Sequence, residues 1–127
     1  MNTAPRILLV DDNEQNLEVY EAVLREHRYG VTKARDGIEG IDRFEKYQPD
    51  LVIVDLMMPR LNGLEFCARL RRSPHGRAVP ILVLTGLNEP DAHRKARQNG
   101  ASDLLVKPFQ TDALLERIRG LLAKPAP

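Results

Sequence analysis

Residues 51–55, LVIVD, form a continuous apolar run that ends in the carboxylate of Asp55. The runs ILLVDD at residues 7–12 and LLVKP at residues 104–108 have the same form, with charged side chains directly after the apolar ones. Continuous apolar runs of this length are typical of strands buried on both faces of a parallel sheet. Ligands of open α/β sheets bind at the carboxyl ends of such strands. If the strands are neighbours, three carboxylates and one ammonium group therefore meet in one small pocket.

Amphipathic segments alternate with these runs, which is the pattern of a βαβ series. The run ILVL at residues 81–84 predicts a further buried strand. The shorter and more polar VTKA at residues 31–34 is typical of an edge strand. With right-handed crossovers, the pattern predicts an α/β fold, a three-layer sandwich of helices around a parallel sheet of about five strands.

The expected helix limits are N-caps at Asn13, Asn62 and Thr111, a stop before Pro49 and a start after Pro90. The helix after Pro90 has little apolar surface, chiefly Ala92 and Ala96, so it should be the least firmly docked. Gly100 is placed to end it in the left-handed conformation. The residues expected to face the core from the other helices are Leu17, Tyr20, Val23, Leu24, His27, Ile38, Ile41, Phe44, Leu64, Cys67, Leu70, Leu114, Leu115, Ile118 and Leu122.

The 127 residues carry 19 Lys and Arg against 18 Asp and Glu, a formal net charge of +1. This balance gives no electrostatic reason to expect direct contact with nucleic acid or with an anionic membrane. Cys67 is the sole cysteine, which excludes a disulfide framework and a thiolate metal cluster, and no apolar run approaches membrane-spanning length. We expect one cytoplasmic domain over residues 1–123, with residues 124–127 as a frayed end or the start of a linker.

The polar residues at the strand ends are suited to phosphoryl chemistry. Mg²⁺ binds oxygen ligands and is usually held by one or two carboxylates together with phosphate oxygens. Asp11, Asp12 and Asp55 would repel one another without a cation, because like charges disfavour each other's ionised form. A carboxylate of Asp55 that is screened by metal could attack phosphorus and form an acyl phosphate. Lys107 would pair with Asp55 at rest and with phosphate oxygens afterwards, and Thr85 offers a hydroxyl to the same oxygens.

Each of these signals alone has a plainer explanation. Aspartates at a strand end commonly cap a helix or line a loop, and a single lysine is usually solvated. Their joint occurrence at the same end of three expected strands, with Thr85 ending another, favours the functional interpretation. The remaining candidates are expected to be structural or solvated: the histidines His27, His75 and His93, and the arginines Arg69, Arg71, Arg72 and Arg77 near one helix end.

These residues resemble a known family, the receiver domain of bacterial two-component response regulators. The matching motifs are LVDDN at residues 9–13, DLMMPRLNG at residues 55–63, LTG at residues 84–86, and GASD at residues 100–103 followed by KPF at residues 107–109. They occur in family order and spacing across nearly the whole chain. The resemblance implies a flavodoxin-like (βα)5 fold with strand order 2-1-3-4-5.

The resemblance also implies a role for each matching residue. Asp55 is the expected phosphoacceptor, which receives a phosphoryl group from a histidine kinase in a Mg²⁺-dependent reaction, and Mn²⁺ could substitute. Asp12 is the expected direct metal ligand, while Asp11 holds the metal mostly through water. The other expected site features are the main-chain carbonyl of Met57 as a metal ligand, Thr85 and Lys107 as phosphoryl-binding groups, and a cis Lys107-Pro108 bond.

The expected partners are a sensor histidine kinase or a phosphotransfer protein, and then a partner protein or output domain on the face near Leu104 and the segment from His93 to Arg97. A homodimer formed on phosphorylation is also compatible with the resemblance. Many family members carry an aromatic residue at the position of Leu104, where its rotamer reports phosphorylation. Leu104 lacks that ring, so we expect the signal to appear as repositioning of the helix after Pro90.

The main interpretation is a phosphoacceptor that catalyses its own phosphorylation, slowly loses the phosphoryl group and is not an enzyme with turnover. Two alternatives stay open. A degenerate receiver would serve only as an interaction scaffold, although the intact acidic pair, nucleophile, threonine and lysine argue against it. A Mg²⁺-dependent aspartyl-phosphate phosphohydrolase would share the nucleophile, but it needs a general-acid carboxylate where Met57 lies. Turnover of a small phosphoester would favour the phosphohydrolase, and stoichiometric labelling would favour the receiver.

Overall fold

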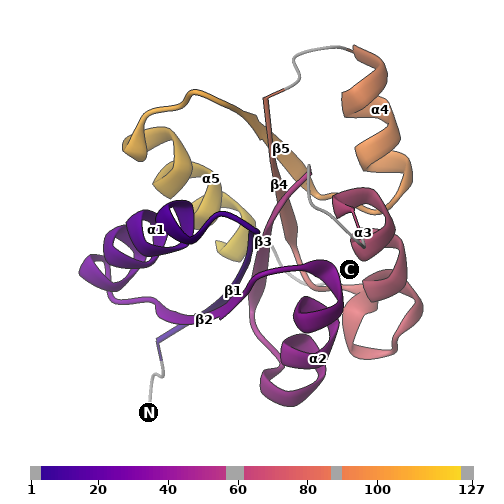
Figure 1. Ribbon diagram of the computed structural model, residues 1–127, viewed down its shortest axis with the longest axis horizontal. Helices are drawn as coiled ribbons and strands as arrows, with labels where there is room; N and C mark the ends of the chain where they lie inside the picture. The colour runs from indigo at the N-terminus through magenta and orange to yellow at the C-terminus, as the bar shows by residue number, and fades with distance from the viewer. Residues whose placement is uncertain (1–3, 57–61, 87–89, 124–127) are drawn as a thin grey trace.

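The structure is a computed structural model that describes residues 4–56, 62–86 and 90–123, with strands and helices alternating along the chain (Figure 1). The elements are β1 (Arg6–Val10), α1 (Glu14–Glu26), β2 (Gly30–Ala34), α2 (Gly37–Tyr47), β3 (Leu51–Asp55), α3 (Gly63–Arg72), the 3₁₀ helix η1 (His75–Arg77), β4 (Ile81–Thr85), α4 (Pro90–Gln98), β5 (Asp103–Val106) and α5 (Thr111–Ala123). All strand pairs are parallel, and the sheet order is β2-β1-β3-β4-β5. The predicted flavodoxin-like fold is therefore confirmed, while the expected tail at residues 124–127 lies outside the described residues.

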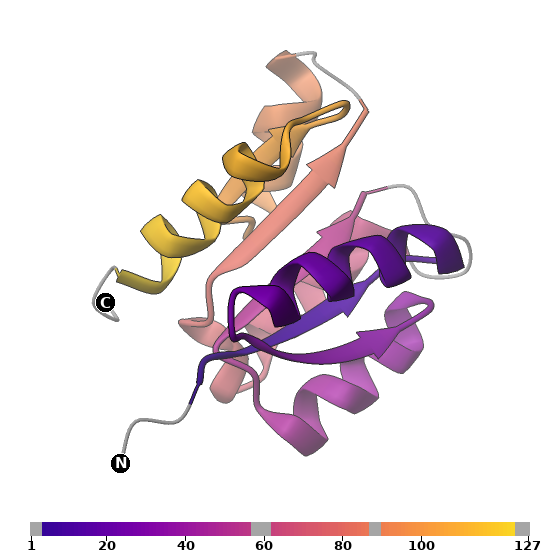
Figure 2. The ribbon, with the colours of Figure 1, turned by 90° about the vertical axis from the view of Figure 1, so that its left-hand side faces the viewer.

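Helices cover both faces of the sheet, α1 and α5 on one face and α2, α3 and α4 on the other (Figure 1). Figure 2 shows the first of these faces, with α1 and α5 in front of the strands. Side chains alternate along β1, so that Ile7 and Leu9 pack with α1 and α5 while Leu8 and Val10 pack toward α2 and α3. Because helices cover both faces of the sheet, β3 and β4 are buried along their whole length. Within the described residues, no helix is both long and apolar enough to cross a bilayer.

Local sequence sets the ends of several helices. The side chains of Asn13 and Asn62 cap α1 and α3, each accepting a bond from the backbone N–H three residues further on. Gly100 follows α4 with φ at +105°, and a Cβ atom there would lie 2.6 Å from the side chain of Arg71. Glycine is therefore required at this turn for both conformation and space. Thr111 differs from the prediction, because it is the first residue of α5 rather than the residue that caps it.

Parts of the predicted helix faces were wrong. Ile38 is 49% exposed, because α2 meets the sheet through its two buried glycines and Phe44. His27 is exposed just beyond the end of α1. In α5 the expected inward residues Leu114, Leu115 and Ile118 are buried, and Leu122 is partly buried and packs against the same core beside the buried Leu121. Ile38 lies in the first turn of α2 and His27 just after the last turn of α1, and sequence periodicity resolves the inward face poorly at helix ends.

Arg71 is partly buried, although this group of arginines was expected at a solvated helix end. Its guanidinium donates to the carbonyl oxygens of Gly76, Val79 and Gly100 and to the hydroxyl of Ser102. Burial lowers the pKa of Arg71. The side chain thus joins the end of α3 to the segments that precede β4 and β5. The neighbouring arginines are exposed, as expected: Arg69, Arg72 and Arg77.

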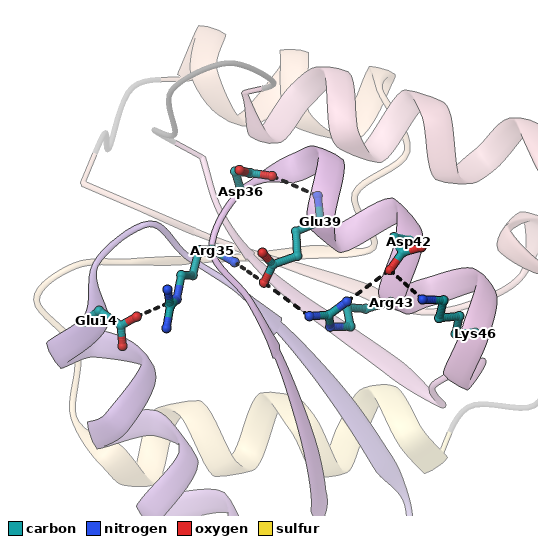
Figure 3. A network of polar contacts seen from close by, with 7 residues as sticks. All are labelled: Glu14, Arg35, Asp36, Glu39, Asp42, Arg43 and Lys46. Atoms are coloured by element: carbon teal, nitrogen blue, oxygen red, sulfur yellow. Dashed lines mark hydrogen bonds and ion pairs between the residues drawn. The ribbon is translucent and has the colours of Figure 1, made fainter.

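A surface network joins the start of α1 to α2 across the carboxyl end of β2 (Figure 3). Its ion pairs are Glu14–Arg35, Glu39–Arg43, Asp42–Arg43 and Asp42–Lys46, and the backbone N–H of Arg35 donates to the Glu39 Oε1 at 3.2 Å and so links the two helices. The network borders a polar cavity of about 330 Å³. Each cation that lines the cavity has a carboxylate partner, including Lys33 with Glu21, so the cavity is close to charge-balanced. Exposed pairs of this kind contribute about 0–1 kcal/mol each, so the network adds little to stability.

Candidate functional site

The ends of four strands bring the predicted site residues to one edge of the sheet. Asp55 and Thr85 are the last residues of β3 and β4, and Asp11 and Lys107 directly follow β1 and β5. The strands are parallel neighbours in register, so their carboxyl ends lie together. Side chains that are far apart in sequence therefore share the edge at which ligands of this architecture bind.

Lys107 holds Asp55 in a short contact that is largely shielded from water. The Lys107 Nζ lies 2.6 Å from the Asp55 Oδ2, and the Asp55 side chain is 8% exposed. Burial lowers the pKa of Lys107, but the hydrogen bond to Asp55 and its charge outweigh burial, so the pKa is raised overall. Lys107 therefore stays protonated at neutral pH, and the pair is a charge-assisted hydrogen bond. A protonated ammonium group therefore lies directly beside the Asp55 carboxylate.

Asp11 is buried, with 3% of its surface exposed, and it lies beside Asp55 because the residues before them, Val10 and Val54, are paired on neighbouring strands. Its Oδ1 accepts a bond of 2.9 Å from the backbone N–H of Asn13, and its Oδ2 accepts one of 3.2 Å from the side-chain Nδ2 of Asn16. Burial raises the pKa of Asp11, the bond from Asn13 lowers it, and the charge of Asp55 raises it again, with a net upward shift. Two carboxylates therefore share a poorly hydrated site, an arrangement that favours a bound cation.

Thr85 is fully buried at the end of β4. Its carbonyl oxygen accepts a 2.7 Å bond from the backbone N–H of Lys107, which joins the two residues across neighbouring strands. The Lys107-Pro108 peptide bond is cis, as predicted. The backbone hydrogen bond between these two residues places Thr85, which carries the hydroxyl, next to Lys107.

The predicted metal ligands are partly assembled. Asp11 and Asp55 lie together, whereas Asp12 is exposed and Met57 lies outside the described residues. Across residues 4–56, 62–86 and 90–123, no three His, Cys, Asp or Glu side chains are grouped closely enough to hold a metal ion. The pair of buried carboxylates still fits Mg²⁺, which is commonly held by one or two carboxylates together with waters and phosphate oxygens.

Tyr20 of α1 lies near the site, although its sequence position predicts only a core contact. Its ring stacks on Phe109 with the centroids 6.1 Å apart. Burial raises the pKa of Tyr20, the charge of Lys107 lowers it, and those of Asp11 and Asp55 raise it, with a net upward shift. Both rings and Lys107 line an apolar cavity of about 330 Å³ between α1 and the start of α5. Helical periodicity alone could not indicate which strand end Tyr20 approaches.

Gly63 begins α3 directly against the backbone at the end of β3. Its N–H donates to the carbonyl oxygen of Leu56 at 3.0 Å, and a Cβ atom there would lie 2.8 Å from the carbonyl oxygen of Asp55. Any larger residue would push α3 away from the candidate phosphoacceptor. The N-cap at Asn62 was predicted from the sequence, but the contact of Gly63 with the backbone of Asp55 was not.

The chain matches one known protein family over most of its length. Residues 7–119 match the family described as the response regulator receiver domain. The chain belongs to this family. Its relatives include response regulator MprA of Mycobacterium sp. (strain KMS), which is 42% identical over 122 residues that cover 96% of this chain and 52% of MprA. The receiver domain thus spans about half the length of the curated relatives that it matches.

Solved receiver structures share the fold. Chemotaxis response regulator CheY4 of Vibrio cholerae superposes with a TM-score of 0.90 at 31% identity, over 94% of this chain and 99% of CheY4. The receiver domain of sensor histidine kinase PA1611 from Pseudomonas aeruginosa gives a TM-score of 0.89 at 33% identity, over 95% of this chain and 99% of that one. The PA1611 structure is described as having a magnesium ion coordinated in its active site cleft.

The expected partner face of this receiver domain is formed by α4 above a buried leucine. Leu104 is 5% exposed, so it lies beneath the surface rather than on it. Ala96 is buried, whereas Arg94, Lys95 and Arg97 are exposed. The exposed charges of α4 are mostly basic, although Arg94 pairs with Asp91 and Arg97 with Asp103.

Proposed function

We propose that this receiver domain accepts a phosphoryl group on Asp55 from the phosphohistidine of a sensor histidine kinase or phosphotransfer protein, in a Mg²⁺-dependent reaction. The observation that carries the proposal is the buried Asp55 carboxylate, which is held 2.6 Å from the ammonium of Lys107 and lies beside the carboxylate of Asp11. A nucleophile, a fixed cation and a second acidic group in one site are suited to phosphoryl transfer.

In the proposed reaction a carboxylate oxygen of Asp55 attacks the phosphorus of the donor. The bond between phosphorus and the imidazole nitrogen breaks, its electron pair stays on that nitrogen, and an acyl phosphate forms on Asp55. The ammonium of Lys107 then transfers its hydrogen bond from the carboxylate to a phosphoryl oxygen, and the hydroxyl of Thr85 binds another. The chain thus takes up one phosphoryl group and loses it slowly, without turnover of a separate substrate.

The residues that would hold Mg²⁺ are Asp11, Asp12 and Asp55 with the main-chain carbonyl of Met57. When bound, the cation offsets negative charge on the carboxylates and on the phosphoryl oxygens. Asp11 and Asp55 support this assignment, because their charges act on each other in a site with little water. The related PA1611 receiver is described with a magnesium ion in its active site cleft, which supports a cation at this site.

We further propose that the phosphorylated state acts through α4 and β5 on a partner protein, an attached output domain or a second copy of the chain, in the cytoplasm. The exposed Arg94, Lys95 and Arg97 supply a basic contact surface on α4. A related protein, RpaA of Synechocystis, is named a DNA-binding dual master transcriptional regulator, and the matched region covers 50% of it. That proportion favours control of an attached domain rather than direct binding of nucleic acid by the receiver.

Labelling with a small phosphodonor tests the proposal. Wild type, Asp55→Asn and Asp42→Asn are incubated with acetyl phosphate or phosphoramidate and Mg²⁺, and the intact mass is measured. Wild type and the control at the exposed Asp42 should each gain one phosphoryl group, whereas Asp55→Asn and wild type in EDTA should gain none. Mn²⁺ should replace Mg²⁺. Labelling of Asp55→Asn would reject the site, and repeated turnover of the phosphodonor would favour a phosphohydrolase.

A further inference from the structure

Asn16, in the first turn of α1, contacts the buried carboxylate of Asp11. Its Nδ2 lies 3.2 Å from the Asp11 Oδ2, while the backbone N–H of Asn13 donates to the other oxygen at 2.9 Å. Because the acceptor is a carboxylate, only the NH₂ side of the Asn16 amide can face it. Each oxygen of Asp11 therefore receives one hydrogen bond from the start of α1.

Two donors on different oxygens fix the plane of the Asp11 carboxylate. A single bond from Asn13 would leave the group free to turn about its Cβ–Cγ bond. A carboxylate has about four acceptor positions, so two bonds from α1 leave other positions available to a ligand. The cap that starts α1 supports this geometry, since the side chain of Asn13 accepts the backbone N–H of Asn16 at 3.0 Å.

The amide of Asn16 has the chemical character that a metal-binding carboxylate requires from its neighbour. A lysine or arginine at this position would neutralise Asp11, and an acidic residue would repel it. A neutral amide orients the carboxylate and leaves its negative charge available to a cation. Asp55 differs in this respect, because its partner Lys107 carries a full positive charge.

We infer that Asn16 is a positioning residue that holds Asp11 in the orientation in which it binds the cation. The inference rests on the proposed function, since it concerns the same site. Groups that orient metal ligands typically change metal affinity by about 10- to 100-fold when they are removed. Loss of the Asn16 amide should therefore weaken cation binding by at least about ten-fold.

Titration with Mn²⁺, followed by the electron paramagnetic resonance of the free ion, measures this effect. Leucine has nearly the shape of asparagine without its donor, so Asn16→Leu is the main variant and Asn16→Ala is the second. The matched control is Gln15→Leu, because Gln15 is the exposed neighbour in the same helical turn. The Kd for Mn²⁺ should rise about ten-fold or more in both Asn16 variants and stay unchanged in the control.

Thermal unfolding in EDTA separates a positioning role from a purely structural one. If Asn16 only stabilised α1, its variants would unfold at lower temperature in EDTA while their folded state bound Mn²⁺ as tightly as wild type. That result would overturn the inference and leave the proposed function intact, provided that wild type binds Mn²⁺ and is labelled at Asp55. Wild type that binds no Mn²⁺ would overturn both.

Discussion

Lys107 has two partners in the proposed reaction, the Asp55 carboxylate before transfer and the phosphoryl oxygens afterwards. The pair is short, but the Lys107 side chain is 29% exposed, so its energy should be smaller than that of a fully buried pair. We predict a coupling free energy of about 1–2 kcal/mol at pH 7 in a double-mutant cycle of Lys107→Met and Asp55→Asn. Urea unfolding of the four proteins measures it, and additive effects of the two substitutions would contradict the prediction.

Cys67 should make the stability of the fold sensitive to alkaline pH. The thiol is fully buried, and burial raises its pKa from 9.0 to about 12. Above pH 9 the unfolded chain loses the thiol proton, whereas the folded chain keeps it. The free energy of unfolding therefore falls as the pH rises from 9 toward 12. Between pH 8 and pH 10.5, wild type should lose about 2 kcal/mol more than Cys67→Ala, as measured by urea unfolding. Parallel pH profiles of the two proteins would show that the thiol ionises equally in both states.

Arg71 and Arg72 are neighbours of the same type with very different surroundings. Arg71 donates to three carbonyl oxygens and a hydroxyl, whereas Arg72 is exposed. Arg71→Ala leaves several of these acceptors without their donor, so it should lower the free energy of unfolding by about 2–4 kcal/mol. Arg72→Ala should change it by less than about 0.5 kcal/mol. Equal effects of the two substitutions in urea unfolding would contradict this account of Arg71.

The roles of some individual side chains could be predicted from the sequence, and those of others could not. The site residues at strand ends could be predicted, because each follows an apolar run whose direction is set by the parallel sheet. The structural role of Arg71 could not be predicted, since its acceptors belong to segments distant in sequence. The contact of Asn16 with Asp11 could have been predicted, because a residue three positions after the Asn13 cap lies one helical turn on and faces the end of β1.

Among the elements, α4 is suited to move because Ala96 is its one buried residue. We predict that amide hydrogens of α4 exchange faster than those of α5, whose face carries four buried apolar residues. Beryllofluoride with Mg²⁺, a mimic of the phosphoryl group, should change exchange in α4 and β5 about five-fold or more. Hydrogen-exchange mass spectrometry measures both effects. Unchanged exchange in residues 90–106 after addition of the mimic would contradict the proposed output through α4.

The elements themselves were predicted with unequal success, for physical reasons. Strands were clear, because burial on both faces requires continuous apolar runs such as β3 and β4. Helix faces were less clear, and Ile38 was placed inward although Gly40 occupies that face instead. A Cβ atom at Gly40 would lie 2.7 Å from the ring of Phe66, so the missing side chain makes room for α3. Periodicity of apolar residues cannot detect a face that depends on the absence of a side chain.

For the whole molecule, the sequence supports the layered parallel sheet, and the strand order came from resemblance to a family. Alternation of apolar runs and amphipathic segments restricts the fold to a few arrangements, but it does not order the strands. The order β2-β1-β3-β4-β5 matters for function, because it makes β1, β3, β4 and β5 consecutive neighbours. Their ends supply Asp11, Asp55, Thr85 and Lys107 to a single site.

Chemical trapping of the acyl phosphate would identify the aspartate that accepts the phosphoryl group. Borohydride reduces an aspartyl phosphate to the alcohol, which converts that aspartate to homoserine. After incubation with acetyl phosphate and Mg²⁺, reduction and peptide mass spectrometry, we predict homoserine at position 55, and none there when EDTA replaces Mg²⁺. Homoserine at a different aspartate, or phosphorylated protein that yields none at position 55, would contradict the account.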